Sequence, residues 1–210
     1  MTKRGLLTHI VRIVLAAALV ASLQGCFAVI VGGAAVGAFA ATDRRSLGAQ
    51  TEDKEIAAKA NTRLSKAIGD AGHVDVTSYN RKVLLTGEVR DEQTKQLAEQ
   101  EVRQVGGVEN VMNELEVTFN SSLSSRSNDA YITTKVRAEL VEERNLNSNS
   151  IEINTERGTV YLLGIVTETE GQIAAIRASK VSGVVRVVKM FEYISDEQLK
   201  QMNALQGQRN

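Results

Sequence analysis

Apolar positions change their spacing along residues 53–119 in an order that predicts helix, strand, strand, helix and strand. In the first part an apolar side chain recurs at every fourth position: Ile56, Ala60, Leu64 and Ile68. This spacing places them on one face of an amphipathic helix. The alternation of Val74 and Val76 with polar residues then predicts a strand, and Asn80-Arg81 predicts a turn into the next strand.

The second predicted strand carries a glycine on its apolar face. The positions on that face are Val83, Leu85, Gly87 and Val89. A glycine in mid-strand indicates close approach by a helix backbone, or a bulge. Asp91 is placed to cap the following helix, which we expect to end at Gly107 before a valine-rich third strand.

The whole pattern returns about 76 residues later. Residues 82–89 correspond to residues 159–166, so that Gly87 corresponds to Gly164, and Gly107 corresponds in turn to Gly183. Two copies indicate a duplicated domain rather than a solenoid, which needs more repeats to bury a core. The predicted fold class is therefore α+β, with two tandem αββαβ domains that each pack a small mixed sheet of three strands against two helices.

The first helix of the second copy has two apolar faces. At 100° per residue, Ile132, Val136 and Leu140 fall within an arc of about 80° and should face the core. A second group lies on nearly the opposite side and forms what we call the outer stripe: Tyr131, Thr134, Ala138 and Val141. Lys135 borders this stripe on one edge and Arg137 lies toward the other. The equivalent positions of the first copy are more polar: Glu55, Ala58, Thr62 and Ser65.

The N-terminal 41 residues follow a different pattern. Three basic residues precede an apolar run at residues 13–21, and the first 25 residues contain no acid. A basic start and a short apolar run are typical of a secretory signal peptide, because the run is too short to cross about 30 Å of hydrocarbon. The next apolar stretch, residues 27–41, is short and rich in glycine, and we interpret it as a tether.

Cys26 is the single cysteine of the chain and follows Leu23-Gln24-Gly25. This order of residues resembles the lipobox of bacterial lipoproteins. The resemblance implies cleavage before Cys26 and attachment of lipid to its thiol, and Phe27 in place of aspartate favours the outer membrane. The alternative is a free cysteine buried in a transmembrane helix.

Composition excludes several classes of function. After cleavage 22 Lys and Arg remain (25 less the three in the leader) against 25 Asp and Glu, so we expect no nucleic-acid partner. His73 is then the remaining histidine, and we expect it at a solvated strand end. We find no pattern of ligands for a metal and no nucleophile with a base, and we therefore predict neither a cofactor nor an enzyme.

The strand around Gly87 or Gly164, followed by a helix and Val-x-Gly-Val-x-x-Val, resembles the BON domain. Two such domains behind a lipobox resemble the dual-BON outer-membrane lipoproteins, and residues 41–48 and 127–137 strengthen the likeness. The predicted organisation is a signal peptide at 1–25, a lipidated tether at 26–52, domains at 53–119 and 129–193, a polar linker at 120–128 and a tail at 194–210. Ser195 begins a capping box in the tail, which predicts a helix.

The outer stripe supports three interpretations. An apolar stripe with a tyrosine and basic margins suits the headgroup region of an anionic bilayer, and in the resembled lipoproteins this helix contacts anionic phospholipid. Glu139, Glu142 and Glu143 oppose such binding. Alternatively, Tyr131 and Val141 pack against the other domain, or the stripe docks another envelope protein.

The second copy is also apolar on its other sheet face. That face carries Tyr161, Leu163 and Ile165, where the first copy has Leu84, Thr86 and Glu88. Three covers for it are possible from the sequence alone: the other domain, the tail or a membrane.

Overall fold

The computed structural model describes residues 43–207. The predictions for the signal peptide, for Cys26 and for most of the tether lie outside this part of the chain. The first domain consists of α3 (Leu47–Ala67), a short 3-10 turn (Gly69–Ala71), β1 (Gly72–Tyr79), β2 (Lys82–Val89), α4 (Glu92–Arg103), β3 (Asn110–Asn113) and β4 (Glu116–Val117). This order confirms the predicted αββαβ unit, with the third strand divided into β3 and β4.

The second domain repeats this order. It consists of α5 (Leu123–Glu142), a 3-10 turn (Ser148–Ser150), β5 (Ile151–Glu156), β6 (Thr159–Val166), α6 (Glu168–Ser179) and β7 (Arg186–Tyr193), followed by α7 (Asp196–Gly207). In the described part of the chain no helix is both long and apolar enough to span a membrane. The described residues, 43–207, lie within one compact unit.

Each sheet is mixed, as the sequence predicts. The middle strand pairs antiparallel with the strand before it and parallel with the strand after the second helix, in both β1-β2-β3 and β5-β6-β7. The hairpin turns have positive φ at Asn80 (49°), Arg81 (65°), Arg157 (49°) and Gly158 (73°). Positive φ at both central positions is the mark of the tight turns that match the twist of paired strands.

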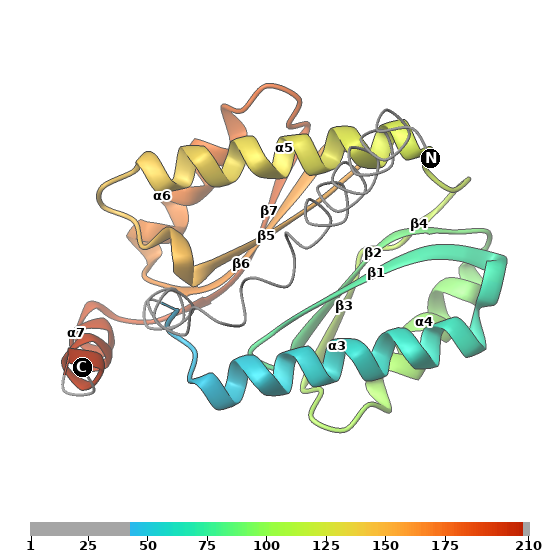
Figure 1. Ribbon diagram of the computed structural model, residues 1–210, viewed down its shortest axis with the longest axis horizontal. Coiled ribbons are helices and arrows are strands. Elements are labelled where there is room, and N and C mark those ends of the chain that lie inside the picture. Colours follow the sequence, from blue (N-terminus) through green and yellow to red (C-terminus); the bar gives the residue numbers. More distant parts are fainter. Residues whose placement is uncertain (1–42, 208–210) are drawn as a thin grey trace, which may run out of the picture. The chain divides into compact units, whose positions relative to one another are not determined.

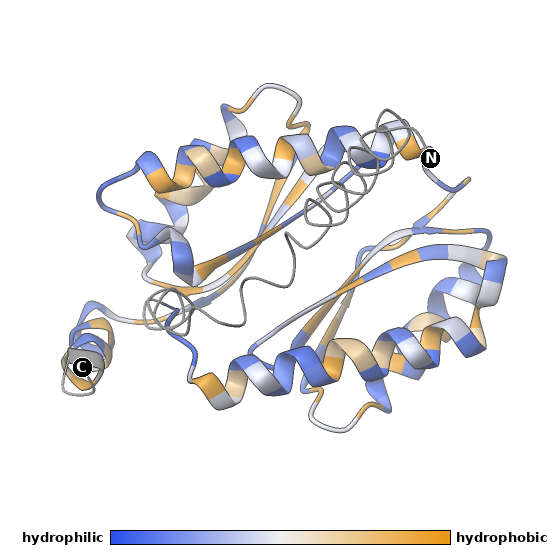
Figure 2. Cartoon of the chain, in the orientation of Figure 1, coloured by the Kyte–Doolittle hydropathy of each residue, from blue (hydrophilic) through white to orange (hydrophobic). Residues whose placement is uncertain are grey.

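Two helices lie on one face of each sheet, α3 and α4 on the first and α5 and α6 on the second (Figure 1). Figure 2 shows that apolar positions recur along the strands of both sheets, whereas the helices alternate between apolar and polar positions. The predicted core positions of the first helices are buried, except that Ile68 is partly buried: Ile56, Ala60, Leu64, Ile132, Val136 and Leu140 are at most 4% exposed. Each domain thus has its own core beneath its helices.

The mid-strand glycines are required by the neighbouring strand and not by a helix. A Cβ on Gly87 would lie 2.1 Å from the carbonyl oxygen of His73, and a Cβ on Gly164 would lie 2.6 Å from that of Ser150. Gly87 also has φ +112°, a conformation that favours glycine. The predicted approach of a helix backbone was therefore wrong, because the close contact lies within the sheet.

The glycines expected to end the second helices lie farther along the chain than predicted. The helix α4 ends at Arg103 and α6 at Ser179, whereas Gly107 and Gly183 lie in the turns that follow. Both have positive φ, and a Cβ on Gly183 would lie 3.0 Å from Ile132. At these two glycines the backbone passes close to the first helix of the same domain.

Helix boundaries correct two predicted segments. The helix α3 begins at Leu47, inside the predicted tether, and α5 begins at Leu123, inside the predicted linker. In each case a serine caps the first turn: Ser46 accepts from the amide of Ala49, and Ser122 accepts from that of Ser125. Serines that were assigned to the tether and to the linker therefore cap the first turns of helices.

The tail forms the predicted helix. The amide of Ser195 donates to the side chain of Gln198, and the amide of Gln198 donates to the hydroxyl of Ser195. This reciprocal pair is the predicted capping box at the start of α7.

Candidate functional site

The outer stripe of α5 is exposed along its whole length. Tyr131 is 62% exposed and Val141 is 63% exposed, and Thr134 and Ala138 between them are exposed as well. The opposite face of the helix is buried in the core of the second domain. Neither Tyr131 nor Val141 packs against the first domain, so this alternative for the stripe is wrong.

A lysine holds the aromatic end of the stripe. The Nζ atom of Lys135 lies 4.7 Å from the centre of the Tyr131 ring, a cation–π distance. The same ammonium donates to the carbonyl oxygen of Ser182, in the turn before β7. The ring therefore stands beside a positive charge that is itself fastened to the domain. On the other edge, Arg137 lies 4.0 Å from Glu152.

The glutamates near the stripe are partly neutralised. Arg177 of α6 makes ion pairs with Glu139 and Glu143. Its hydrogen bond to Glu143 holds the pKa of that carboxyl below its usual value. Two of the three glutamates expected to oppose binding of an anionic surface, Glu139 and Glu143, thus share a cation from the next helix.

The matching face of the first domain offers no such surface. On α3, Glu55, Ala58, Thr62 and Ser65 are exposed, and Lys59 pairs with Glu55 at 2.6 Å instead of lying against a ring. The duplicated helices therefore differ where they face solvent and agree where they face the core.

The other apolar sheet face of the second domain is covered by the first domain. A buried cluster joins side chains of both domains: Tyr79, Leu84, Tyr161, Leu163, Ile165 and Met190. Of the three covers open to the sequence, the other domain is the one found in the structure. The two sheet faces differ in polarity but not in burial, because Thr86 and Glu88 of the first domain are buried as well.

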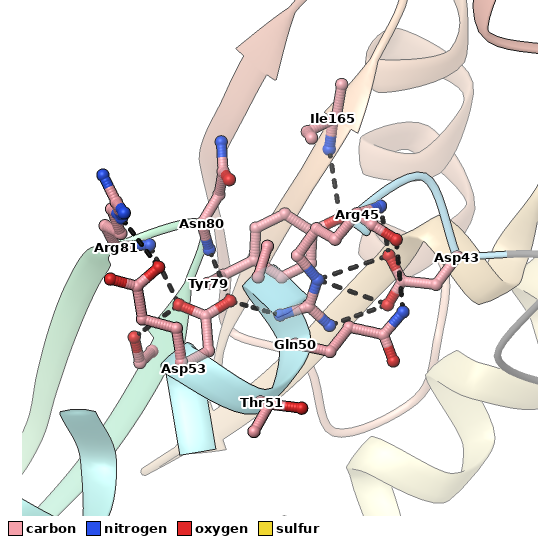
Figure 3. Close-up of polar contacts among 12 residues, drawn as sticks. Asp43, Arg45, Gln50, Thr51, Asp53, Tyr79, Asn80, Arg81 and Ile165 are labelled. Carbon is pink, nitrogen blue, oxygen red and sulfur yellow. Dashed lines mark hydrogen bonds and ion pairs between the residues drawn. The ribbon is translucent and has the colours of Figure 1, made fainter. Parts of the chain in front are cut away.

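Tyr79 ties the first domain to the edge of the second (Figure 3). Its hydroxyl donates to the carbonyl oxygen of Ser150 at 3.0 Å and accepts from the amide of Ile165 at 3.4 Å. The Arg45 guanidinium lies 3.9 Å from the centre of the tyrosine ring. Burial raises the pKa of Tyr79 to about 12, so the phenol keeps the proton that it donates.

A buried aspartate under each hairpin was missed by the sequence analysis. Asp53 accepts from the amides of Asn80 and Arg81, and it also binds Arg45 (Figure 3). In the second domain Asp129 accepts in the same way from the two amides of its hairpin turn. The sequence does contain a signal for them, because the two aspartates stand one repeat period apart on amphipathic helices.

The segment just before α3 also joins the two domains. Arg44 is buried, and its guanidinium donates to both carboxylate oxygens of Glu170 and to the carbonyl oxygen of Ile165. Burial alone would raise the pKa of Glu170, but its hydrogen bonds from Arg44 and Thr167 outweigh burial and hold the pKa below the usual value. This part of the predicted tether therefore binds the second domain through Arg44.

Acidic side chains and a histidine gather where the two domains meet. Glu88 has no exposed side-chain surface, and its carboxylate lies 3.5 Å from Arg157 and 3.9 Å from His73. Burial, then the charge of Glu88, raises the pKa of Glu156 to about 7. His73 lies at the start of β1 as predicted, and its side chain is 32% exposed although its Nδ1 atom is buried. Among residues 43–207 no group of three or more His, Cys, Asp or Glu side chains is arranged to hold a metal ion.

Residues 52–118 and 128–195 each match the BON domain. The chain is 38% identical over 174 residues to the outer membrane lipoprotein DolP of Haemophilus influenzae, across 82% of this chain and 90% of the relative. It is 28% identical over 154 residues to the 21 kDa hemolysin of Actinobacillus pleuropneumoniae, across 72% of this chain and 79% of the relative. The C-terminal domain of CdsD from the Type III secretion system of Chlamydia trachomatis covers 64% of this chain and 96% of its own, with a TM-score of 0.29 and 9% identity, which is too slight to argue from.

Proposed function

Because the chain belongs to the BON-domain family and carries two copies of the domain, we propose that it is a non-enzymatic outer-membrane lipoprotein that binds anionic phospholipid through α5 of its second domain and supports envelope integrity. The observation that carries the lipid site is the exposure of Tyr131 beside Lys135. The relative named an outer membrane lipoprotein supports the location, and the protein would face the periplasm.

The duplication itself argues for a special role of α5. The two domains share their core pattern, so differences on the outer faces of α3 and α5 are not needed for folding. An aromatic and aliphatic stripe with cationic margins fits the boundary between lipid headgroups and acyl chains, where tyrosine keeps its hydroxyl in water. Lys135 would lie near the lipid phosphates and contribute about 1 kcal/mol.

Lipid attachment at Cys26 would supply the permanent anchor, and α5 would add recognition of the surface. Each buried methylene of an acyl chain contributes about 0.8 kcal/mol, so several long chains hold a protein on the membrane without help from the folded domains. Mass spectrometry of the N-terminal peptide from membrane-purified protein tests this part. We expect a peptide that begins at Cys26 and carries acyl chains.

Vesicle binding by the unlipidated unit, residues 42–210, tests the lipid site. Tyr131→Glu places a charge in the exposed stripe without touching the core face of α5. We expect at least about tenfold weaker binding to phosphatidylglycerol vesicles, with an unchanged melting temperature and little binding of either form to phosphatidylcholine. Lys135→Glu should also weaken binding, and added salt should erase most of that difference.

The matched control is Thr62→Glu, at the equivalent place on α3, which should bind as wild type does. A stable Tyr131→Glu protein that still binds phosphatidylglycerol fully would exclude α5 as the lipid site and favour a protein-docking adaptor. In cells, a strain that lacks the protein should become sensitive to detergent. The Tyr131→Glu protein should fail to restore resistance if lipid binding serves the envelope.

A further inference from the structure

In the first domain, the residue at the end of α4 reaches across to the first helix. Gln104 is the C-terminal cap of α4 and accepts a hydrogen bond from Arg63 of α3 at 2.6 Å. Both residues line an open pocket of about 420 Å³, together with Lys59 of α3 and Gly106 of the following turn. This position of the repeat therefore places a side chain on the solvent side of the two helices, beside a lysine.

Lys180 occupies the same position in the second domain. It ends α6 as Gln104 ends α4, one repeat period later. Lys135 stands on α5 where Lys59 stands on α3. Its ammonium donates to the carbonyl oxygen of Ser182, two residues beyond Lys180. The repeat thus brings two lysines to one place, Lys135 from α5 and Lys180 from the end of α6, and we call them the lysine pair.

The packing of α6 gives the same placement for Lys180. Ala174 and Ala178 are buried in the core of the second domain. Arg177 points toward α5, where it pairs with Glu139 at 3.9 Å. At 100° per residue, Lys180 lies about 60° from Arg177, on the side away from the two alanines. Because Lys180 is also exposed, it faces α5 on the solvent side of the helices, where the outer stripe lies.

The charges at this place differ between the two domains. In the first domain the carboxylate of Glu55 pairs with Lys59 at 2.6 Å. In the second domain Tyr131 takes the place of that glutamate, and Lys180 takes the place of a neutral glutamine. In the described part of the chain neither Lys135 nor Lys180 forms an ion pair with a carboxylate. Two differences between the copies therefore leave more positive charge beside the outer stripe.

The glutamates of α5 do not cancel this charge. Glu139 is the acidic residue nearest to Lys135 along the helix, and it pairs with Arg177. Glu143 pairs with the same arginine at 2.5 Å. Glu142 stands seven residues beyond Lys135, which is about 10 Å farther along the helix axis. The surface at the level of the lysine pair therefore stays positive, and the acidic residues gather toward the C-terminal end of α5.

We propose that the lysine pair binds the phosphate of an anionic phospholipid headgroup, with Tyr131 beside it at the boundary to the acyl chains. This site rests on the proposed function, because it identifies the group by which the same membrane contact selects its lipid. Each ammonium is a compact charge with three donors on a flexible stem, so two lysines can hold one phosphate from two sides. A phosphatidylcholine headgroup carries the same phosphate together with a cation that the lysines repel, and the pair therefore favours anionic lipid.

Vesicle binding by the 42–210 unit tests the site with Lys180→Gln, which installs the residue type that the first domain has at this position. We expect about fivefold weaker binding to phosphatidylglycerol vesicles, a difference that added salt should largely remove. Lys180→Arg keeps the charge and should bind as wild type does. The matched control is Lys54→Gln, which removes an exposed lysine from α3 and should also bind as wild type does. The melting temperature reports the folding of each variant.

A double-mutant cycle tests whether the two lysines share one phosphate. Lys135→Gln, Lys180→Gln and the double variant are compared with wild type on phosphatidylglycerol vesicles. If both ammonium groups hold the same phosphate, loss of either one removes most of the effect. We therefore expect the double variant to lose less affinity than the product of the two single losses. Losses that multiply would show two independent surface charges and would overturn the shared site.

The other outcomes separate this site from the proposed function. Full binding by Lys180→Gln, with loss of binding by Tyr131→Glu, would overturn the lysine pair and leave the proposed function intact. Equal losses for Lys180→Gln and Lys54→Gln would assign the effect to net charge and overturn the pair as well. Sodium phosphate should compete no better than sodium chloride of the same ionic strength, and stronger competition would assign the site to free phosphate. A wild type that does not bind the vesicles would overturn both proposals.

Discussion

At the scale of single residues, Gly164 joins two features of the fold. The carbonyl oxygen of Ser150 lies 2.6 Å from the place of a Cβ on Gly164, and the same oxygen accepts the hydrogen bond of Tyr79. A side chain at this position would therefore disturb both the pairing of β5 with β6 and the contact between the domains. Gly87 is restricted more directly, by its positive φ and by the carbonyl of His73.

We expect Gly87→Val and Gly164→Val each to lower the free energy of unfolding by about 2 kcal/mol or more, because the added side chain meets backbone that cannot move away. Urea denaturation measures the effect. Gly106→Val is the control, since no atom lies within 4 Å of a Cβ at that position. Stabilities of both strand variants within error of wild type would show that the strands can spread without cost.

Glu156 makes the protein sensitive to pH. Burial and the charges of Glu88, Asp129 and Asp75 raise its pKa to about 7 in the folded protein, against an ordinary value of 4.5. Between these two values the folded state holds a proton that the unfolded state has lost. The contribution of Glu156 to the free energy of unfolding is therefore largest below about pH 4.5 and falls as the pH rises to about 7.

The change Glu156→Gln removes that dependence. Because the carboxyl is only half-buried and solvent screens it, we expect the variant to be more stable than wild type by about 1 kcal/mol at pH 8, with the difference vanishing near pH 4. Denaturation at a series of pH values measures it. Glu152→Gln, on the same strand, is the control. A wild type whose stability relative to Glu156→Gln does not change with pH would contradict the raised pKa.

At the scale of elements, α5 combines a core face that repeats with an outer face that does not. Its core residues stand where those of α3 stand, one repeat earlier. Its N-terminal turns, however, come from the serine-rich segment that resembles a linker. Ser122 begins the helix by accepting the amide of Ser125, so the domains are joined by fewer irregular residues than the composition indicates.

Removing the Ser122 cap should lower the stability of the second domain by a measurable amount. We expect Ser122→Ala to destabilise the second domain by about 1 kcal/mol, because the amide of Ser125 then loses its acceptor. Ser124→Ala, an exposed serine in the same turn, should change the stability by no more than about 0.5 kcal/mol. Thermal unfolding compares the two. Equal melting temperatures for both variants would indicate that the first turn of α5 is not held by its cap.

At the scale of the whole unit, the two sheets bury each other's outer faces. Leu84 has no exposed surface and belongs to the cluster shared between the domains, whereas Val83 and Leu85 beside it belong to the core of the first domain. Alternate residues of one strand thus serve two different interfaces, as the alternation of side chains along a strand allows. This joint burial leaves α5 free to face outward.

Leu84→Glu tests the shared cluster without entering either domain's own core. A charge in an apolar interface is costly, so we expect the two domains to separate while each keeps its helices and strands. Small-angle scattering should show a larger radius of gyration, and thermal unfolding should show two transitions. Thr62→Glu, on the outer face of α3, should leave both unchanged. An unaltered radius for Leu84→Glu would mean that the apolar cluster does not hold the domains together.

Local periodicity was sufficient to determine the elements of each domain. Leu64 and Leu140 were assigned to cores correctly because a helix brings every third or fourth residue to one face whatever the rest of the chain does. The hairpins and the mixed sheets followed from alternation and from turn residues, and the second copy confirmed the first. The position of the outer stripe opposite the core face followed from the same angular reasoning, whereas its exposure was decided by the tertiary structure.

The tertiary structure alone decided what lies between the domains. Nothing near Glu88 or Thr86 in the sequence marks them as buried, because their cover comes from the other repeat. Tyr79 reaches Ser150 and Ile165, which stand 71 and 86 residues away along the chain. Such contacts depend on the shapes of two finished surfaces, and a pattern with a period of two or four residues carries no information about which surfaces meet.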